Sequence, residues 1–178
     1  MREIAPDALL VENERYRLGN LISFEVGAQQ LKPGGFLLMN TDHIYPPAIA
    51  EIVARTAAEA TEVTAFCDFD RRLGPDDMKV QLGPDRHVVN MSKQLERWDA
   101  GYVGMTYVPA DGRQAHREAA QRSRRAQGDA VHVEQVLVEL ARSGAPPAIA
   151  DISGHGWHEV DEPDERQRAE QALLGPTR

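Results

Sequence analysis

The sequence predicts an α/β fold in which a small β excursion interrupts an alternation of helices and strands. Strand-like and helix-like segments alternate over roughly the first 70 residues, a hairpin-like stretch follows, and the alternation then resumes. The apolar run GFLLMNTDH at residues 35–43 ends in a carboxylate, which is typical of a buried parallel strand. At 178 residues the chain can bury one core and is too short for two, so residues 1–178 are expected to form a single domain.

The first half of the chain is expected to hold two helices. Spaced apolar residues allow an amphipathic helix over residues 21–31. Pro46 and Pro47 begin a second helix that runs to about residue 60, because proline is tolerated in a first helical turn. Short apolar runs bounded by turn residues predict strands. These strands cover residues 9–11, 35–40, 62–69, 78–82 and 87–91, with turn-rich sequence at 70–77 and a hairpin-type turn at 83–86.

The second half is expected to add two strands and three helices. Residues 101–108 and 147–152 have strand-like sequence. Residues 113–127 form a strongly polar helix that is expected to be exposed, and residues 131–142 form an amphipathic helix that stops before Gly144. The last helix, residues 161–174, begins with an acid-rich turn around Pro163, as a helix amino terminus prefers.

Charge and composition exclude several classes of function. The 28 acidic and 20 basic residues give a formal charge of −8, which disfavours a nucleic-acid partner. No stretch approaches the roughly 18 apolar residues of a membrane span. The acidic start does not resemble a secretion signal, so a cytoplasmic location is expected. The one cysteine, Cys67, forms no internal disulfide and is expected to be a buried thiol.

Two acidic segments suggest a metal site. Asp42 follows the apolar strand, at the end where open α/β sheets bind ligands. A second acidic segment, WHEVD at residues 157–161, lies more than a hundred residues later. One or two carboxylates suit Mg²⁺, which completes its shell with water and phosphate oxygens. A zinc site at His155 and His158 is disfavoured, because no further ligands follow at convincing intervals.

Four blocks of sequence carry a resemblance to a known family. The first runs from VEN at residues 11–13 to GNLIS at 19–23, and the second is FLLMNTDHIY at 36–45. The third combines DDMKV at 76–80, MSK at 91–93 and YVG at 102–104, and the fourth is GWHEVDEPD at 156–164. In this order and spacing they resemble nucleotidyltransferases of the sugar-nucleotide pyrophosphorylase superfamily, nearest to the CTP:phosphocholine and CTP:inositol-1-phosphate cytidylyltransferases.

The resemblance implies a Rossmann-like nucleotide-diphospho-sugar transferase fold, truncated at its amino terminus, with a mostly parallel sheet and a small β-hairpin insertion. It also implies a reaction in which a phosphomonoester attacks the α-phosphorus of a nucleoside triphosphate and releases pyrophosphate. Such a reaction needs positioning and charge neutralisation above all. CTP is the preferred nucleotide, and the acceptor is phosphocholine, inositol-1-phosphate, a phosphonate or a sugar phosphate.

The resemblance also assigns catalytic and metal-binding residues. Asp42 would hold Mg²⁺ against the α-phosphate, with Glu159 or Asp161 as the partner ligand. Glu159 ranks first, because Asp161 could instead cap the helix that follows it. Lys93 matches the lysine that contacts the acceptor phosphate, and Lys79 is a second phosphate-binding candidate.

Three further residues match positions near the nucleotide. Asn20 and Ser23 correspond to the loop that meets the base, although both could also serve a helix start. Thr41 stands where relatives carry glycine, just before the metal aspartate, so its β-branched side chain would adjoin the nucleotide.

One family element has no counterpart in residues 1–20, namely the glycine-rich loop that cradles the triphosphate. Three interpretations therefore stay open. The chain is part of a cytidylyltransferase; or it is a shortened, non-catalytic module that binds a nucleotide, a phosphoester or another protein; or it is an enzyme that a partner chain completes. A sheet without its first strands would expose an edge, which makes a homo-oligomer plausible.

Overall fold

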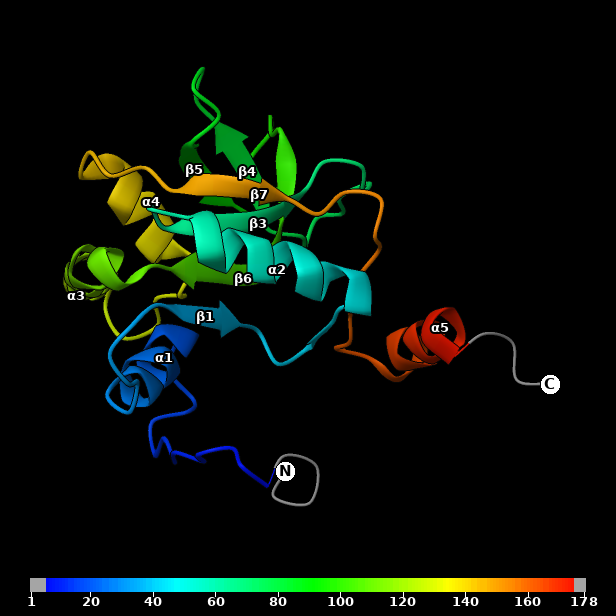
Figure 1. The fold of residues 1–178 in the computed structure, drawn as a ribbon, viewed down its shortest axis with the longest axis horizontal. Helices are drawn as coiled ribbons and strands as arrows, with labels where there is room; N and C mark the ends of the chain where they lie inside the picture. Colours follow the sequence, from blue (N-terminus) through cyan, green and yellow to red (C-terminus); the bar gives the residue numbers. More distant parts are fainter. Residues whose placement is uncertain (1–5, 175–178) are drawn as a thin grey trace.

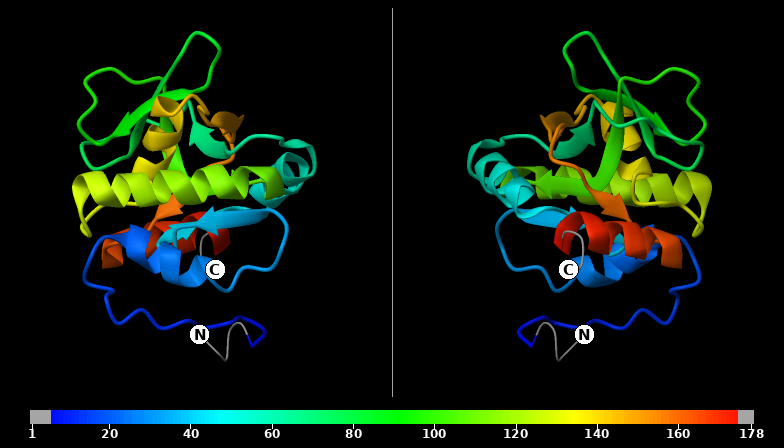
Figure 2. Two further views of the ribbon diagram at one scale, coloured as in Figure 1. Left: turned by 90° about the vertical axis from the view of Figure 1, so that its left-hand side faces the viewer. Right: turned by 90° about the vertical axis from the view of Figure 1, so that its right-hand side faces the viewer.

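The computed structural model describes residues 6–174, which form a six-stranded mixed sheet with helices on both faces (Figures 1 and 2). This confirms the predicted α/β class. The helices are α1 (Asn20–Ala28), α2 (Pro47–Glu59), α3 (Arg113–Gln127), α4 (Gln135–Arg142) and α5 (Pro163–Leu174), with a 3-10 turn at Ala110–Gly112. The strands are β1 (Phe36–Met39), β2 (His43–Ile44), β3 (Thr64–Asp68), β4 (Lys79–Leu82), β5 (Val88–Ser92), β6 (Ala100–Val108), β7 (Ala148–Asp151) and β8 (His158–Glu159).

The sheet has the order β5-β4-β6-β3-β7, and β1 also pairs with β6. Strand β6 runs antiparallel to β1, β3 and β4, whereas β3 and β7 are parallel. The expectation of a mostly parallel sheet is therefore wrong for the described strands. Along the chain, the hairpin formed by β4 and β5 comes between β3 and β6, whereas in the sheet β6 lies between β4 and β3 and runs antiparallel to both.

Strand β1 is an edge strand rather than a buried parallel one. It pairs only with β6 among the described residues, and its last residue, Met39, is 43% exposed. An apolar run predicts burial on both faces, but the partner on each side depends on the whole sheet. The prediction of burial for this segment is therefore only half met, since Phe36, Leu37 and Leu38 are partly buried.

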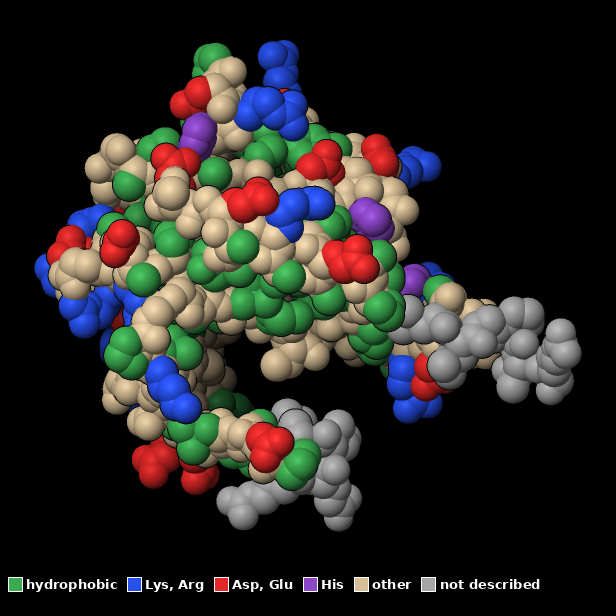
Figure 3. All heavy atoms as spheres, viewed as in Figure 1, with side chains coloured by type: hydrophobic (Ala, Val, Ile, Leu, Met, Phe, Trp, Pro, Cys, Tyr) green, Lys and Arg blue, Asp and Glu red, His purple; other side chains and the backbone are tan. Residues whose placement is uncertain are grey.

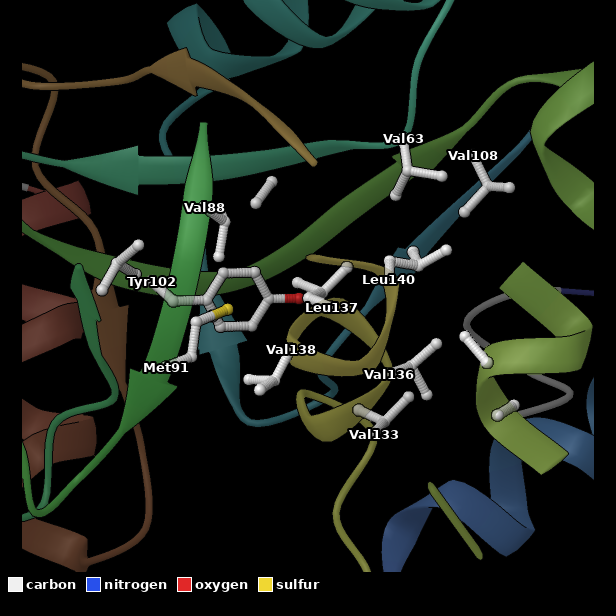
Figure 4. Packing of buried hydrophobic residues seen from close by; sticks show 14 of the residues in the cluster. Val63, Val88, Met91, Tyr102, Val108, Val133, Val136, Leu137, Val138 and Leu140 are labelled. Atoms are coloured by element: carbon white, nitrogen blue, oxygen red, sulfur yellow. The ribbon is translucent and has the colours of Figure 1, made fainter. Parts of the chain in front are cut away.

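Two clusters of buried side chains pack the two faces of the sheet. On one face, Val136, Leu137 and Leu140 of α4 contact the cluster that includes Met91 and Tyr102 (Figure 4). On the other face, Ile49 of α2 packs with a smaller cluster that includes Phe66 and Val103. Because β3 contributes Ala65 and Cys67 to the first cluster and Phe66 to the second, it is buried throughout. Cys67 is the buried free thiol that its sequence context predicts.

Helix α3 is less exposed than expected. Its residues His116, Ala119, Ala120 and Ser123 are buried, and their spacing places them on one helical face. Because two alanines and a serine are small, this face of α3 can pack closely against its neighbours, although the helix is polar on average. The arginines occupy the outer face, where Arg122 pairs with Glu139 at 2.7 Å.

Three smaller expectations change in the structure. Residues 9–11 form no strand, and Leu9 is 71% exposed. Helix α4 begins at Gln135 rather than at residue 131, and α1 ends at Ala28 rather than at residue 31.

On the face drawn in Figure 3, acidic and basic side chains are interspersed over the surface. Within residues 6–174, every helix is too short or too polar to cross a membrane.

Candidate functional site

A pocket of about 520 Å³ lies beside the connection from β1 to β2. Its lining comes from segments that are far apart in the sequence. The resemblance named eight site residues, and the pocket brings five of them together. These five are Asn20, Asp42, Lys93, Glu159 and Asp161.

A short two-stranded sheet joins the two acidic segments. Strand β2 pairs antiparallel with β8, so that His43 lies opposite Glu159. The backbone N–H of Val160 also donates to the carbonyl oxygen of Asp42 at 2.8 Å. As a result, one ligand atom from each of Asp42, His43 and Glu159 lies within 4.8 Å of the other two. The predicted proximity of Asp42 and a tail carboxylate is therefore observed.

His43 is held between Asp42 and Trp157. Its Nδ1 lies 2.7 Å from Oδ1 of Asp42, and its ring stacks on the indole with centroids 5.1 Å apart and planes 5° apart. The indole is itself fixed, because its Nε1–H donates to Asp68 at 3.0 Å and the guanidinium of Arg71 lies over its ring. The side chain of His43 is 5% exposed and that of Asp42 is 43% exposed, so the imidazole orients the carboxylate and leaves it open to the pocket.

The electrostatics of the cluster favour a bound cation. Burial raises the pKa of the Glu159 carboxyl above its ordinary value, His43 opposes this shift, and Asp161, Asp42 and Asp77 add to it. A cation offsets both the lost hydration and the repulsion between carboxylates. The two carboxylate oxygens are also the donors that hard divalent cations prefer, so the residues present fit such an ion.

Asp161 lines the same pocket but lies outside the three-residue cluster. The structure also gives its segment a role at the start of α5. Oε2 of Glu165 accepts hydrogen bonds from the backbone N–H groups of Asp161 and Glu162, at 2.9 and 3.1 Å. This arrangement caps the amino terminus of the helix.

The two candidate lysines differ sharply in their surroundings. Lys93 is exposed and is the one Lys or Arg among the described residues that line the pocket. Lys79 is 5% exposed and does not line it. Its ammonium group donates to the carbonyl oxygens of Gly74 at 2.9 Å and Lys93 at 2.8 Å, with longer contacts to two further carbonyls. These contacts engage the donors that a phosphate would need, so the observed role of Lys79 is structural.

The predicted nucleotide-facing residues extend into a neighbouring pocket of about 510 Å³. Ser23 and Thr41 line this second pocket, whereas Asn20 and Asp42 line both. Oδ1 of Asn20 accepts from the N–H of Val133 at 2.7 Å, which ties α1 to the segment before α4. The expected capping roles at the start of α1 are not observed, because no side chain caps that helix.

Two glycines explain close packing around the site. Gly104 has a φ of +70°, and a Cβ there would lie 2.9 Å from the amide nitrogen of Asn40 and 3.0 Å from Nε2 of His43. Glycine at this position of the YVG block therefore allows the side-chain amide of Asn40 and the imidazole of His43 to pack against β6. A Cβ at Gly101 would lie 2.6 Å from the side chain of Leu73.

Several pocket residues received no role from the sequence. His132 and Glu134 precede α4, and Tyr102 lies on β6. Asp76 and Asp77 belong to the DDMKV block, yet only the lysine of that block was assigned a function. Polar residues alternate with valine over residues 131–134, where the sequence was predicted to begin a helix. This alternation could have indicated that the segment is extended and faces a ligand.

Comparison with known proteins supports the resemblance in both sequence and fold. No family model matches the chain. A curated relative, the bifunctional IPC transferase and DIPP synthase of Rubrobacter xylanophilus, is 27% identical over 167 residues. The match covers 93% of this chain and 36% of that protein, so the chain spans about a third of the relative's length.

Two solved structures share the fold. The inositol-1-phosphate CTP transferase from T. maritima superimposes with a TM-score of 0.77 at 17% identity, over 97% of this chain and 69% of that one. A nucleoside-diphosphate-sugar pyrophosphorylase from Vibrio cholerae RC9 superimposes with a TM-score of 0.56 at 15% identity, over 83% of this chain and 61% of that one. The predicted resemblance to this superfamily is confirmed.

Proposed function

We propose that this chain, which resembles the CTP:inositol-phosphate branch of the nucleotidyltransferase superfamily, carries the site for transferring a nucleoside monophosphate to a phosphomonoester. The nucleotide is CTP and the first-choice acceptor is inositol-1-phosphate, since the T. maritima protein that shares the fold is named an inositol-1-phosphate CTP transferase. Phosphocholine, a phosphonate and a sugar phosphate are the other acceptors to test. The observation that carries the proposal is the meeting of Asp42 and Glu159 in a pocket that also contains Lys93.

The chemistry is a displacement at phosphorus. A phosphate oxygen of the acceptor forms a bond to the α-phosphorus of CTP, and the bond from that phosphorus to the bridging oxygen of the β-phosphate breaks. Pyrophosphate leaves with the bonding electrons, and no proton donor is needed at a phosphate leaving group. The protein therefore contributes positioning and charge neutralisation.

Each site residue has one task in this displacement. Asp42 and Glu159 hold a divalent cation, which we propose to be Mg²⁺ and which would neutralise the phosphate oxygens when bound. His43 orients Asp42 through their 2.7 Å contact. Lys93 binds the acceptor phosphate. The cation is needed for binding as well as for chemistry, because carboxylates outnumber ammonium groups in the pocket lining.

Residues 1–178 are proposed to form one partial nucleotidyltransferase domain, because the longer T. maritima chain matches almost all of them with 69% of its length. A non-catalytic binding module is therefore the second candidate.

The edge of β1 that faces away from β6 is unpaired among the described residues, and it offers a place for a further strand from the same protein, a second copy or a partner. The unpaired thiol of Cys67 fits a cytoplasmic location.

The test is pyrophosphate release from CTP with each acceptor in the presence of Mg²⁺. We expect turnover with inositol-1-phosphate, loss of turnover with EDTA, and a loss of at least about 100-fold in Asp42→Ala, since a metal ligand in phosphoryl transfer is hard to replace. Glu51→Gln on the exposed face of α2 is the matched control and keeps full activity. A folded chain that binds CTP without turnover of any acceptor contradicts the catalytic proposal and favours the binding module.

A further inference from the structure

Glu134 is the least explained polar residue of the pocket. It is 7% exposed, and its Oε2 is the one buried side-chain nitrogen or oxygen in the described part of the chain that has no hydrogen-bond partner. A buried carboxylate oxygen without a donor costs free energy, on the order of 1–3 kcal/mol or more. The fold therefore keeps a group that destabilises the free protein.

The surroundings of Glu134 fix its backbone but provide no hydrogen-bond donor for its Oε2. It immediately precedes α4, and its carbonyl oxygen accepts from the N–H of Leu137 at 3.0 Å. The N–H of Val133 is bound to Asn20. The hydroxyl of Tyr102, which lines the same pocket from β6, is hydrogen-bonded to the hydroxyl of Thr106 at 2.8 Å. The amino terminus of α4 favours a negative charge there but offers no hydrogen bond to this side chain.

Glu134 lines the same pocket as Lys93, Asp42 and Glu159. A ligand in this pocket would therefore lie beside the Glu134 side chain. We propose that Glu134 determines acceptor specificity by accepting a hydrogen bond from a hydroxyl group of a polyol phosphate whose phosphate is bound by Lys93. This inference rests on the proposed function for the location of the acceptor and adds the group that distinguishes acceptors.

The pocket favours a polyol over a quaternary ammonium acceptor. A carboxylate oxygen that lacks a donor is satisfied by an O–H group, whereas a trimethylammonium group carries no O–H or N–H. Recognition of a quaternary ammonium group also relies on open aromatic faces. Among the described residues that line the pocket, the Tyr and Trp side chains are those of Tyr102 and Trp157, which are 5% and 4% exposed. The ring of Trp157 is already covered by His43 and Arg71.

The test measures ligand binding and stability on the same variants. Glu134→Met keeps the length of the side chain and removes both oxygens. Calorimetric titration with Mg²⁺ present is expected to give at least tenfold weaker binding of inositol-1-phosphate, because a hydrogen bond to a charged group is lost. Binding of phosphocholine and of inorganic phosphate is expected to change by less than about twofold. The melting temperature of Glu134→Met is expected to equal or exceed that of the parent chain.

Glu139→Met is the matched control on the same helix. Glu139 pairs with Arg122, so this variant is expected to melt lower and to bind inositol-1-phosphate normally. A lower melting temperature for Glu134→Met with unchanged binding would show a structural role and overturn the inference. Equal weakening of all three ligands would overturn it too, as would a parent chain that binds inositol-1-phosphate no better than inorganic phosphate. Specific binding of the polyol without pyrophosphate release would instead contradict the proposed transferase and leave this inference standing.

Discussion

The indole ring of Trp157 lies parallel to the imidazole ring of His43, with their centroids 5.1 Å apart. This contact joins the residue that precedes β8 to the residue that follows Asp42. The stacking therefore fixes the imidazole that contacts Asp42 in the candidate metal cluster. The hydrogen bond from the indole to Asp68 anchors the two rings to β3.

Replacing Trp157 should separate packing from hydrogen bonding. Trp157→Ala is expected to lower the free energy of unfolding by about 3–5 kcal/mol, because a buried ring is lost. Trp157→Phe keeps a ring against His43 but leaves Oδ2 of Asp68 without its donor, and about 1–3 kcal/mol should be lost. Urea unfolding measures both. Trp98→Phe is the control, since Trp98 is 43% exposed, and a large loss there would contradict this account.

The ligand role of Glu159 can be tested against that of Asp161. Glu159→Gln is expected to weaken binding of Mn²⁺, used as a spectroscopic substitute for Mg²⁺, by at least about tenfold, since one of the two carboxylates proposed to bind the ion is lost. Asp161→Asn should change it by less than about threefold, because Asp161 lies outside the cluster. The opposite ranking would assign the second ligand to Asp161.

The two candidate lysines should give opposite results. Lys79→Met removes a buried ammonium group and leaves two carbonyl oxygens without their short hydrogen bonds, so a loss of about 3 kcal/mol in unfolding free energy is expected. Lys93→Met should leave the melting temperature unchanged and raise KM for the acceptor phosphate by about tenfold. Equal melting temperatures for the two variants would refute the structural role of Lys79.

His116 predicts a dependence of stability on pH. Burial lowers its pKa from 6.5 to about 4, beside the rings of Phe24 and Phe36. The unfolded chain therefore binds the proton more tightly than the folded one, so this contribution is intact above pH 6.5 and is lost as the pH falls towards 4. The full loss is about 3 kcal/mol. Urea unfolding at pH 7.5 and 5.0 should show a smaller decrease in His116→Phe than in the parent chain, and equal decreases would contradict the assignment.

Local pattern was enough to predict most elements and part of the site. Helix α2 follows from two prolines and spaced apolar residues, and its predicted bounds differ from the observed ones by about one residue at each end. The block containing Asp42 and the block containing Glu159 could be paired by resemblance, because each keeps its candidate metal-binding carboxylate within a recognisable run of residues. Helix α3 shows the limit of composition, since its buried stripe is visible only in the spacing of small residues.

The amino-acid sequence by itself determined the class of fold, the hairpin insertion and the candidate metal aspartate, because these depend on periodicity, turn residues and short blocks of sequence along the chain. Only the tertiary structure decided that β1 lies at an edge, that Lys79 is buried while Lys93 is exposed, and that the carboxylate of Glu134 faces no donor. The physical reason is that strand neighbours, burial and hydrogen-bond satisfaction arise from contacts between segments distant in sequence, which no local pattern encodes.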